Sequence, residues 1–334
     1  MTSATSIERI DIHHHFFPPS LSRLKAAQSQ GVGFRTPPEN LPWSANLSLR
    51  VMDTLGIQLA VLSLPSGALE TADEARKANA MMHEIVRQHE NRFAFWGCLG
   101  DWRDVEGALQ LIPYVFDELS AVGIAVSSSY GFGGEARYIG DDLFDPIWSA
   151  LNARNAIIFV HGTQTPSLTP IPHPTLGLPV TEVPHETFKA AAQLVVSGKT
   201  RRFDRLAFVL AHMGGSTLAL APRVAGLARY MGAPLSEDEI LMEFRRYWWD
   251  TALSGSSSAA CSAEGWGIGD HILWGSDFPA VSLDTIRWFD SNLEKGYQTN
   301  PSQLENIRRK NILGLFESRG VSLFTGRIPN RSLV

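Results

Sequence analysis

Cysteine is nearly absent from this chain of 334 residues, which contains only Cys98 and Cys261. Two cysteines cannot build the disulfide framework of a small secreted domain, so a reducing compartment is the simpler expectation. Residues 1–8 are polar and lack the apolar segment of a secretory signal peptide. No apolar run is long enough to span a bilayer. We therefore expect a soluble, cytoplasmic protein that is not embedded in a membrane.

Charge is also scarce. Asp, Glu, Lys and Arg make up 19% of the residues, the formal net charge is −5 and no basic block occurs. A nucleic acid or an anionic membrane surface would require clustered positive charge, so neither is expected as a partner. Hydrophobic residues make up 44% of the chain, which is enough for a sizeable core and excludes a disordered protein.

A glycine-rich G-x-G-x-x-G turn is missing after the first expected strand, where a dinucleotide-binding fold would have one. The chain instead alternates short apolar runs with longer amphipathic stretches. Most of the short runs are rich in Val, Ile, Leu and Phe, which is typical of strands buried on both faces. The eight expected strands cover residues 8–13, 57–64, 92–99, 122–127, 156–161, 206–212, 247–252 and 271–276.

Amphipathic helical patterns separate these strands. They cover residues 71–90, 104–119, 142–154, 185–198, 214–231 and 301–316. The last pattern begins with Pro301, which suits a first helical turn, and we expect this C-terminal helix to close the ring. Repeated strand–helix units in a chain of this length predict a single (β/α)₈ TIM-barrel domain over residues 1–334.

Two segments are longer than ordinary connections. Residues 16–48 form a long insertion after the first strand, and residues 163–184, which contain six prolines, follow the fifth. Long loops are usually surface excursions. Both segments, however, leave the carboxyl end of a strand, where the active sites of such barrels lie. A role as a lid or pocket wall and a purely structural role are about equally expected.

Three consecutive histidines end the first expected strand, in 10-IDIHHHFFPP-19. Side chains alternate along a strand, so His13 and His15 should project to one side and His14 to the other. An H-x-H pair of this kind resembles half of a metal site, although such pairs are also common on protein surfaces.

Other strands end in further candidate ligands. His161 and His212 close the fifth and sixth expected strands, and Asp277 closes the eighth. Taken singly, each is more simply a strand-end histidine or a helix-capping aspartate. In a closed barrel, however, these strand ends converge on one mouth. The combined set predicts a site for a divalent ion, Zn²⁺ or Mn²⁺, with a position open for water or substrate.

The chain resembles the mononuclear-metal branch of the amidohydrolase superfamily, the amidohydrolase 2 group. That group includes aminocarboxymuconate-semialdehyde, γ-resorcylate, isoorotate and 6-methylsalicylate decarboxylases. The resemblance covers almost the whole chain and depends on the order and spacing of 10-IDIHHHFFPP-19, 159-FVHG-162, 211-AHMGGS-216, 249-WDTAL-253, 273-LWGSDFP-279 and 306-NIRRKNILGLF-316. Within the group, 182-EVPHETFKAAAQLVVSG-198 and the Phe16-Phe17 pair look closest to the 6-methylsalicylate and γ-resorcylate type.

The resemblance implies one divalent metal ion, with Zn²⁺ favoured over Mn²⁺. Its ligands would be His13, His15, His161 and Asp277. The resemblance also implies that His212 works as the general acid/base and that Asp277, besides binding the metal, donates a proton to the substrate.

Two arginines match family positions that bind a carboxylate. Arg223 stands eleven residues after His212, where the family arginine often reaches into a neighbouring subunit, so a homodimer is expected. Arg50 lies in 49-LRVMDTLGI-57. The family proline of the Arg223 segment is replaced by Leu218, and Pro222 stands next to the arginine instead, which leaves the direction of Arg223 open. For both arginines, a solvated charge on a helix face is the alternative.

The fourth expected strand ends in 124-IAVSSSYG-131, without the lysine that bridges two metals in binuclear hydrolases of the superfamily. One metal and a nearby arginine suit a carboxylate substrate better than amide hydrolysis. The resemblance therefore implies a metal-dependent, non-oxidative decarboxylase that releases CO₂ from a hydroxylated aromatic, salicylate-type acid or a related unsaturated acid. Two alternatives remain: a single-metal hydrolase or hydratase of a lactone, amide or enoic acid, and a non-catalytic barrel that only binds.

Overall fold

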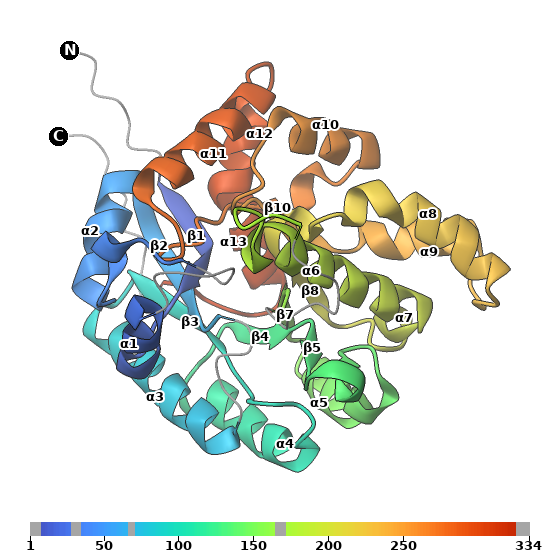
Figure 1. Cartoon of the computed structure of the whole chain (residues 1–334), viewed down its shortest axis with the longest axis horizontal. Coiled ribbons are helices and arrows are strands. Elements are labelled where there is room, and N and C mark those ends of the chain that lie inside the picture. Colours follow the sequence, from blue (N-terminus) through green and yellow to red (C-terminus); the bar gives the residue numbers. More distant parts are fainter. Residues whose placement is uncertain (1–7, 28–34, 66–70, 164–171, 325–334) are drawn as a thin grey trace.

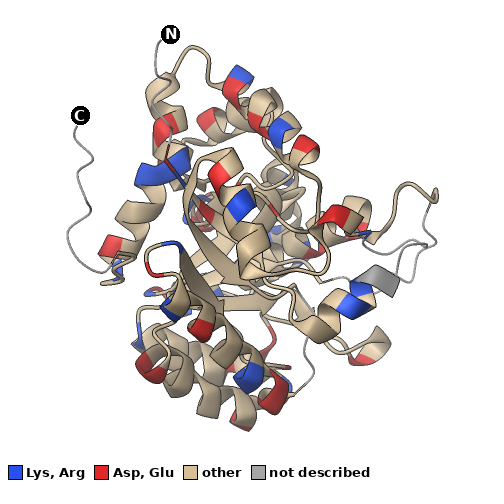
Figure 2. Cartoon of the chain, turned by 90° about the vertical axis from the view of Figure 1, so that its left-hand side faces the viewer, with Lys and Arg blue, Asp and Glu red and all other residues tan. Residues whose placement is uncertain are grey.

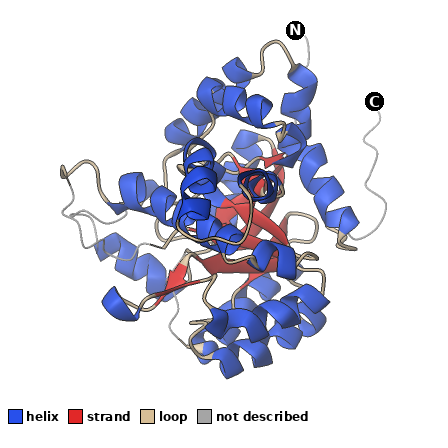
Figure 3. Ribbon diagram, turned by 90° about the vertical axis from the view of Figure 1, so that its right-hand side faces the viewer, coloured by secondary structure: helices blue, strands red, loops and turns tan. Residues whose placement is uncertain are grey.

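The computed structural model describes residues 8–27, 35–65, 71–163 and 172–324. Eight parallel strands form one sheet in the order β1-β2-β3-β4-β7-β8-β9-β10, and helices surround it (Figures 1 and 3). The strands are β1 Arg9–His15, β2 Ile57–Ser63, β3 Phe93–Gly97, β4 Gly123–Ser127, β7 Ile157–His161, β8 Ala207–Leu210, β9 Trp248–Asp250 and β10 Ile272–Leu273. Every expected strand is present, and the predicted (β/α)₈ barrel is confirmed.

The longer helices lie outside this sheet. They are α1 Pro19–Ala27, α2 Ala45–Leu55, α3 Ala72–Gln88, α4 Val105–Pro113, α5 Asp145–Ala153, α6 Leu178–Val196, α8 Thr217–Tyr230, α9 Glu237–Arg245, α10 Ser257–Trp266, α11 Leu283–Gly296 and α13 Asn311–Ser318. Shorter helices are α7 Lys199–Arg202 and α12 Pro301–Glu305, and β5 Ser129–Tyr130 pairs with β6 Arg137–Tyr138 as a separate antiparallel ribbon.

Several boundaries differ from those expected. Helices α1, α2, α9, α10 and α11 were not predicted, although a serine cap marks the beginning of α2, α9, α10 and α11. Helix α9, for example, begins with a capping box between Ser236 and Glu239. Helix α6 begins at Leu178, inside the segment expected to be a loop, because Pro179 is tolerated in a first helical turn. Of the two long segments, residues 28–34 and 164–171 lie outside the described residues.

The outer surface carries charges of both signs spread over the helices, without a single-sign patch on the face in view (Figure 2). Among the described helices, none combines the length and the apolar character needed to cross a bilayer.

The first and last strands close the barrel through residues that carry the expected ligands. The backbone amide of Asp277 donates to the carbonyl of His13 at 2.9 Å, and the amide of His15 donates to the carbonyl of Phe278 at 2.6 Å. Closure of the sheet therefore brings the beginning and the end of the chain together at the barrel mouth.

The opposite end of the barrel is filled by the C-terminal helix. Trp96 of β3 stacks on Phe159 of β7 and on Phe316 of α13, with ring centroids 5.8 Å apart in both pairs. The side-chain amide of Asn311, at the start of α13, donates to the carbonyl of Ile272, the first residue of β10. Helix α13 therefore plugs the amino ends of the strands and leaves their carboxyl ends as the accessible side.

Replacement of Phe316, which is 1% exposed, should test this plug. Phe316→Ala removes a ring from the barrel interior and should lower the free energy of unfolding by about 3–5 kcal/mol. The matched control is Phe132→Ala, because Phe132 is 67% exposed. Denaturant unfolding of both variants at equal metal loading measures the difference, and equal losses would contradict the role assigned to α13.

Candidate metal centre

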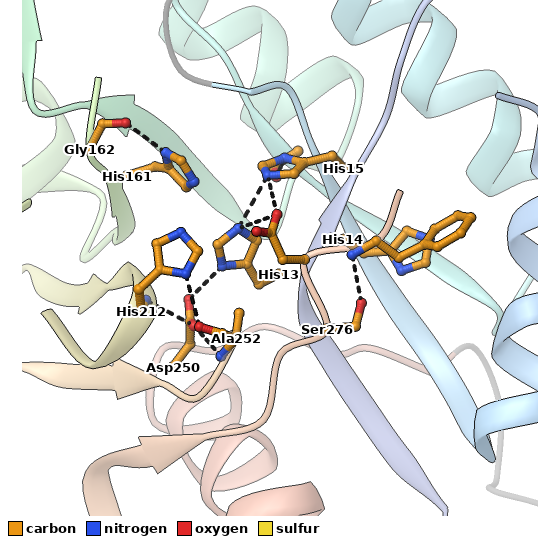
Figure 4. Close-up of polar contacts among 12 residues, drawn as sticks. His13, His14, His15, His161, Gly162, His212, Asp250, Ala252 and Ser276 are labelled. Atoms are coloured by element: carbon orange, nitrogen blue, oxygen red, sulfur yellow. Dashed lines mark hydrogen bonds and ion pairs between the residues drawn. The ribbon is translucent and has the colours of Figure 1, made fainter. Parts of the chain in front are cut away.

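Strand β1 places His13 and His15 at the barrel mouth, and its pairing with β2 shifts register between Asp11 and His14. The ring of His13 packs edge-on against Phe159 of the barrel core, with centroids 5.0 Å apart. The Nε2 atoms of His13 and His15 lie 3.2 Å apart. His14 points outward, where its Nδ1 contacts Asp11 at 2.9 Å (Figure 4). The alternation predicted for the three histidines is therefore present.

Five ionisable side chains meet at this mouth. Oδ1 of Asp277 lies 3.4 Å from Nε2 of His13 and 3.0 Å from Nε2 of His15. The ring of His161 is centred 5.1 Å from that of His13 and 5.2 Å from that of His212. All five are buried, none being more than 6% exposed. Figure 4 shows the four imidazoles turned toward one another.

These side chains form two overlapping groups that could hold a metal ion. Ligand atoms of His13, His15 and His161 lie within 4.8 Å of one another, and so do those of His13, His212 and Asp277. The structure thus brings together the four ligands and the additional histidine that the sequence predicts. Imidazole nitrogens with one carboxylate oxygen form a donor set suited to a divalent transition metal.

Two of the imidazoles are anchored by backbone carbonyls. Nδ1 of His161 donates to the carbonyl of Gly162, and Nδ1 of His212 donates to the carbonyl of Ala252, both at 2.9 Å. A carbonyl oxygen only accepts hydrogen bonds, so Nδ1 carries the proton in both rings. In the neutral ring, Nε2 then keeps its lone pair and faces the centre, as a metal ligand or a proton acceptor must.

The other two imidazoles are anchored by side chains. Nδ1 of His13 donates to Oδ2 of Asp250 at 2.9 Å, and Nδ1 of His15 pairs with the hydroxyl of Ser63 at 3.1 Å. Oδ1 of Asp250 also accepts from the backbone amide of His212 at 3.1 Å. Outer partners of this kind fix ring orientation and tautomer at metal sites. Asp250 therefore orients two of the four histidines.

Asp11 joins the two ligand-bearing segments from outside the barrel. Its Oδ1 accepts from the backbone amides of His13 at 3.2 Å and Ser276 at 3.0 Å. Its Oδ2 contacts Nδ1 of His14 and accepts from the hydroxyl of Ser276 at 2.5 Å. Next to Ser276, a side chain on Gly275 would meet the Cβ of His13 at 2.7 Å, so only glycine fits there.

Three residues that hold the histidines in place, Asp250, Asp11 and Ser63, were not assigned a role from the sequence. Their positions in the sequence could have drawn attention to Asp250 and Asp11. Asp250 lies in the quoted 249-WDTAL-253 segment and ends β9, as the ligands end other strands. Asp11 stands two residues before His13. Ser63 also ends a strand, but a serine is too common at such positions to be singled out.

Backbone strain is concentrated at the centre. His212, Leu253 and Asp277 have φ angles of 57°, 49° and 61°. Residues other than glycine rarely adopt this left-handed conformation, and those that do are often found at functional sites. His212 and Asp277 also lie just beyond β8 and β10 rather than within them, so tight turns, not regular strand, direct both side chains.

The electrostatic environment favours an ionised carboxylate beside neutral imidazoles. Burial raises the pKa of Asp277, but His13 and His15 lower it more, so the pKa lies well below its usual range. Burial and the neighbouring histidines lower the pKa of His161 well below 6.5. Burial also lowers the pKa of His15, despite its contact with Asp277. These are the protonation states that metal binding requires.

His13 is the exception. Burial lowers its pKa, but the carboxylates of Asp250 and Asp277 outweigh burial and raise the pKa to about 10. Oδ1 of Asp277 is buried and makes no well-directed hydrogen bond. Both observations indicate a local excess of negative charge that a divalent cation would balance. The residues present therefore fit a bound divalent metal.

A cavity of about 760 Å³ opens over the centre. His15, His161, His212 and Asp277 contribute to its lining. Its apolar walls include residues of both long segments, of the turn after β2, and of α11 with the residues just before it, namely Phe17, Pro65, Pro174, Pro179, Val180, Val183, Pro184, Val281 and Phe289. The cavity is therefore lined mainly by apolar residues, with three imidazoles and the carboxylate of Asp277 among its polar groups.

The two expected substrate-binding arginines lie elsewhere in the single chain. Arg223 on α8 and Arg50 on α2 are exposed, and neither is among the described residues that line the cavity. Two roles therefore stay predictions: that Arg223 acts in a neighbouring subunit, and that Arg50 binds substrate.

Comparisons with known proteins extend these observations. The family model described as Amidohydrolase matches residues 10–317. The 6-methylsalicylic acid decarboxylase of Aspergillus aculeatus is 31% identical over 325 residues, covering 92% of this chain and 96% of the relative. The γ-resorcylate decarboxylase of Rhizobium sp. strain MTP-10005 is 24% identical over 314 residues, covering 85% and 91%. These relatives are decarboxylases of hydroxylated aromatic acids.

Solved structures share the fold. A 2,6-dihydroxybenzoate decarboxylase in complex with 2,6-dihydroxybenzoate superposes with a TM-score of 0.77 at 21% identity, covering 93% of this chain and 99% of that chain. The dihydroxybenzoic acid decarboxylase of Polaromonas sp., with bound manganese and the inhibitor 2-nitroresorcinol, gives 0.78 at 21% identity, covering 93% and 97%. Because the family model spans nearly the whole barrel and includes every ligand position described above, the chain belongs to the amidohydrolase 2 family.

Proposed function

We propose that this protein is a metal-dependent, non-oxidative decarboxylase, a carboxy-lyase that releases CO₂ from a hydroxylated aromatic acid of the salicylate type. The observation that carries the proposal is the buried set of four imidazoles and one carboxylate beneath a mainly apolar cavity. Such walls suit an aromatic ring. The named activities of the relatives, on 6-methylsalicylic acid and γ-resorcylate, support the substrate class.

We assign His13, His15, His161 and Asp277 as ligands of one divalent ion. We favour Zn²⁺ because imidazole-rich sites with an open position are typical of catalytic zinc. Mn²⁺ is the alternative, since the Polaromonas relative was solved with manganese. When bound, a divalent cation acts as a Lewis acid that orients the substrate oxygens and stabilises negative charge on them. The absence of a lysine after β4 supports a single ion.

Decarboxylation requires that a proton replace CO₂ on the ring carbon. We assign this proton transfer to Asp277, which lies at the cavity surface beside His212. Because the pKa of Asp277 is well below its usual range, the carboxylate is ionised at rest and must receive the proton from a neighbour. His212 can relay it: its Nδ1 is fixed by Ala252, and its Nε2, which faces the centre, can take up a proton from a water molecule and pass it to Asp277. The apolar walls limit competing water.

We further propose a homodimer formed through α8 and α9. Four large apolar side chains of this region are exposed, Leu227 by 46%, Tyr230 by 86%, Met231 by 81% and Met242 by 55%. Helices α8 and α9 project from the barrel side by side (Figure 1). Clustered exposed apolar groups favour a protein interface. An interface here would place Arg223 of α8 near a neighbouring subunit, whereas Arg50 remains a secondary candidate for substrate binding.

The first test is CO₂ release together with metal content on one sample. Salicylate, 6-methylsalicylate and 2,6-dihydroxybenzoate form the substrate panel. About one divalent ion per chain is expected, with activity lost on chelation and restored by Zn²⁺ or Mn²⁺. Lactone or amide turnover without CO₂ from any acid would favour the single-metal hydrolase. A metal-free protein without turnover would favour the binding barrel.

A second test separates the roles of the two catalytic candidates. His212→Ala should keep the metal but lower kcat by about 10²–10⁴-fold, because it removes a proton-transfer group. Asp277→Asn should lower both metal content and kcat, because we assign its carboxylate as a metal ligand and as the group that transfers the proton to the substrate. Near wild-type turnover in either variant would contradict the assignment.

A third test concerns Asp250. Asp250→Asn weakens the hold on Nδ1 of His13 and should lower metal affinity by about 10–100-fold. Asp73→Asn is the matched control, because Asp73 is exposed on α3, away from the centre. Competition with a chromophoric chelator measures both variants, and equal metal affinity would show that Asp250 does not orient the ligand.

A further inference from the structure

The beginning of α6 lies directly against the segments that carry two of the imidazoles. Val183 and Pro184 of this helix line the cavity. A side chain on Gly162, the residue after His161, would collide with the carbonyl oxygen of Val183. A side chain on Gly215, three residues after the imidazole that follows β8, would collide with the carbonyl oxygen of Pro184. These close approaches between backbones fix the wall formed by α6 relative to the metal centre.

Leu253, a second part of the wall, is fixed by a different route. The residue before it, Ala252, has both of its backbone polar groups bonded at the metal centre. Its amide donates to Oδ1 of Asp250 at 2.8 Å, and its carbonyl accepts from Nδ1 of His212 at 2.9 Å. Leu253 itself has a φ of 49°, a left-handed conformation that suits glycine or asparagine better than leucine. Strain of this kind, kept at a cavity wall, points to a function of the side chain.

Neither side chain can form a hydrogen bond with a ligand. Val183 is 3% exposed and Leu253 is half-buried, and both face the cavity as hydrocarbon. The hydroxyl groups among the described lining residues are those of Ser254 and of Thr175, and the second is exposed and paired with Nδ1 of His173 at 2.8 Å.

The cationic side chains of the lining, Lys25 and Arg35, come from the insertion after β1 rather than from α6 or the turn that carries Leu253. The wall nearest to His161 and His212 on the α6 side is therefore apolar.

We propose that Val183 and Leu253 form the contact surface for an alkyl substituent on the ring of the aryl acid, and so favour an alkyl-substituted salicylate over a dihydroxybenzoate. The inference deepens the proposed function, on which its substrate class rests. An alkyl group against these side chains is removed from water, which is favourable. A hydroxyl group in the same place loses its hydrogen bonds to water and finds no partner on either side chain. Both acids offer the metal a carboxylate and an adjacent hydroxyl, so the discrimination falls to the wall.

Two non-reacting probes isolate this contact on the metal-loaded protein. 2-Nitroresorcinol and 3-methyl-2-nitrophenol share a ring, a nitro group and one adjacent hydroxyl, and neither has CO₂ to lose. They differ only on the other side of the nitro group, where the first has a hydroxyl and the second a methyl. The measured quantity is the ratio of their dissociation constants in each variant, because differences between the free ligands cancel when variants are compared.

Two substitutions make the wall polar. Val183→Thr replaces a methyl by a hydroxyl of similar size, and Leu253→Asn supplies an amide from a residue type that tolerates the left-handed conformation. The matched control is Val195→Thr, because Val195 is fully buried on the same helix and is not among the described lining residues. Ser254→Ala tests the neighbouring hydroxyl.

Calorimetry should show that Val183→Thr and Leu253→Asn each shift the ratio by about fivefold or more in favour of 2-nitroresorcinol, as expected for the gain of a hydrogen bond and the loss of an apolar contact. Val195→Thr and Ser254→Ala should leave the ratio within about twofold of wild type. Metal content should be unchanged in all four variants, because none of them removes a ligand. With acids that are turned over, kcat/KM for 6-methylsalicylate should fall relative to that for 2,6-dihydroxybenzoate in the two wall variants.

An unchanged ratio in both wall variants would overturn the inference. An equal shift in Val195→Thr would also overturn it, because the effect would then come from a weakened α6. Weaker binding of 2-nitroresorcinol alone in Ser254→Ala would overturn it as well, because the substituent would then lie against a polar side chain.

The proposed function fails separately. If the ratios shift as expected but no aryl acid releases CO₂, the assignment of the wall stands and decarboxylation does not. Release of CO₂ with ratios that do not shift would leave decarboxylation intact and remove the inference.

Discussion

The hydrogen bonds that close the barrel between β1 and the segment after β10 are the constraint on which the whole site depends. The amide of Asp277 donates to the carbonyl of His13, and the carboxylate of Asp11 accepts from backbone amides on both sides of this closure. Closure of the barrel therefore fixes the position of β1, which carries His13 and His15, relative to the segment after β10, which carries Asp277. Metal affinity and barrel stability are coupled in consequence, because an ion bound by both segments favours the closed state over the unfolded chain.

The second constraint is the cost of burying five ionisable side chains together. The protein satisfies the outer nitrogen of every ring, through Gly162, Ala252, Ser63 and Asp250, and leaves every inner nitrogen facing the others. Buried polar groups without partners are expensive, and the unsatisfied Oδ1 of Asp277 lies among those inner nitrogens. A divalent cation would accept lone pairs from the nitrogens of His13, His15 and His161 and from Asp277 at once. The geometry is thus better explained by a ligand set than by a structural cluster of histidines.

The sequence predicted the strands, and the side chains that meet at the barrel mouth, better than the rest of the molecule, and the reason is physical. Strands buried on both faces have continuous apolar runs, which are easy to recognise in a sequence. In a parallel barrel the carboxyl ends of all strands lie at the same mouth, so a residue at a strand end can be placed there. The hydrogen bond between Asp250 and His13 joins residues that are far apart in the sequence, and no local pattern encodes such a contact. The path of an irregular insertion is equally invisible in the sequence, and Arg50 and Arg223, which were named by resemblance, are exposed.

The structure divides the site between two kinds of element. The four imidazoles and the carboxylate of Asp277 come from strand ends and the tight turns that follow them, whose positions are fixed by the sheet. Much of the cavity wall comes from the β1 insertion and from the proline-rich segment before α6, including Pro174 and Pro179. Proline restricts the unfolded chain, so such a wall can be ordered at a lower entropic cost than a flexible loop. Substitutions among the wall residues of the two segments can therefore change which acid is accepted without moving the metal-centre side chains, because those side chains are held by strand ends and the turns after them.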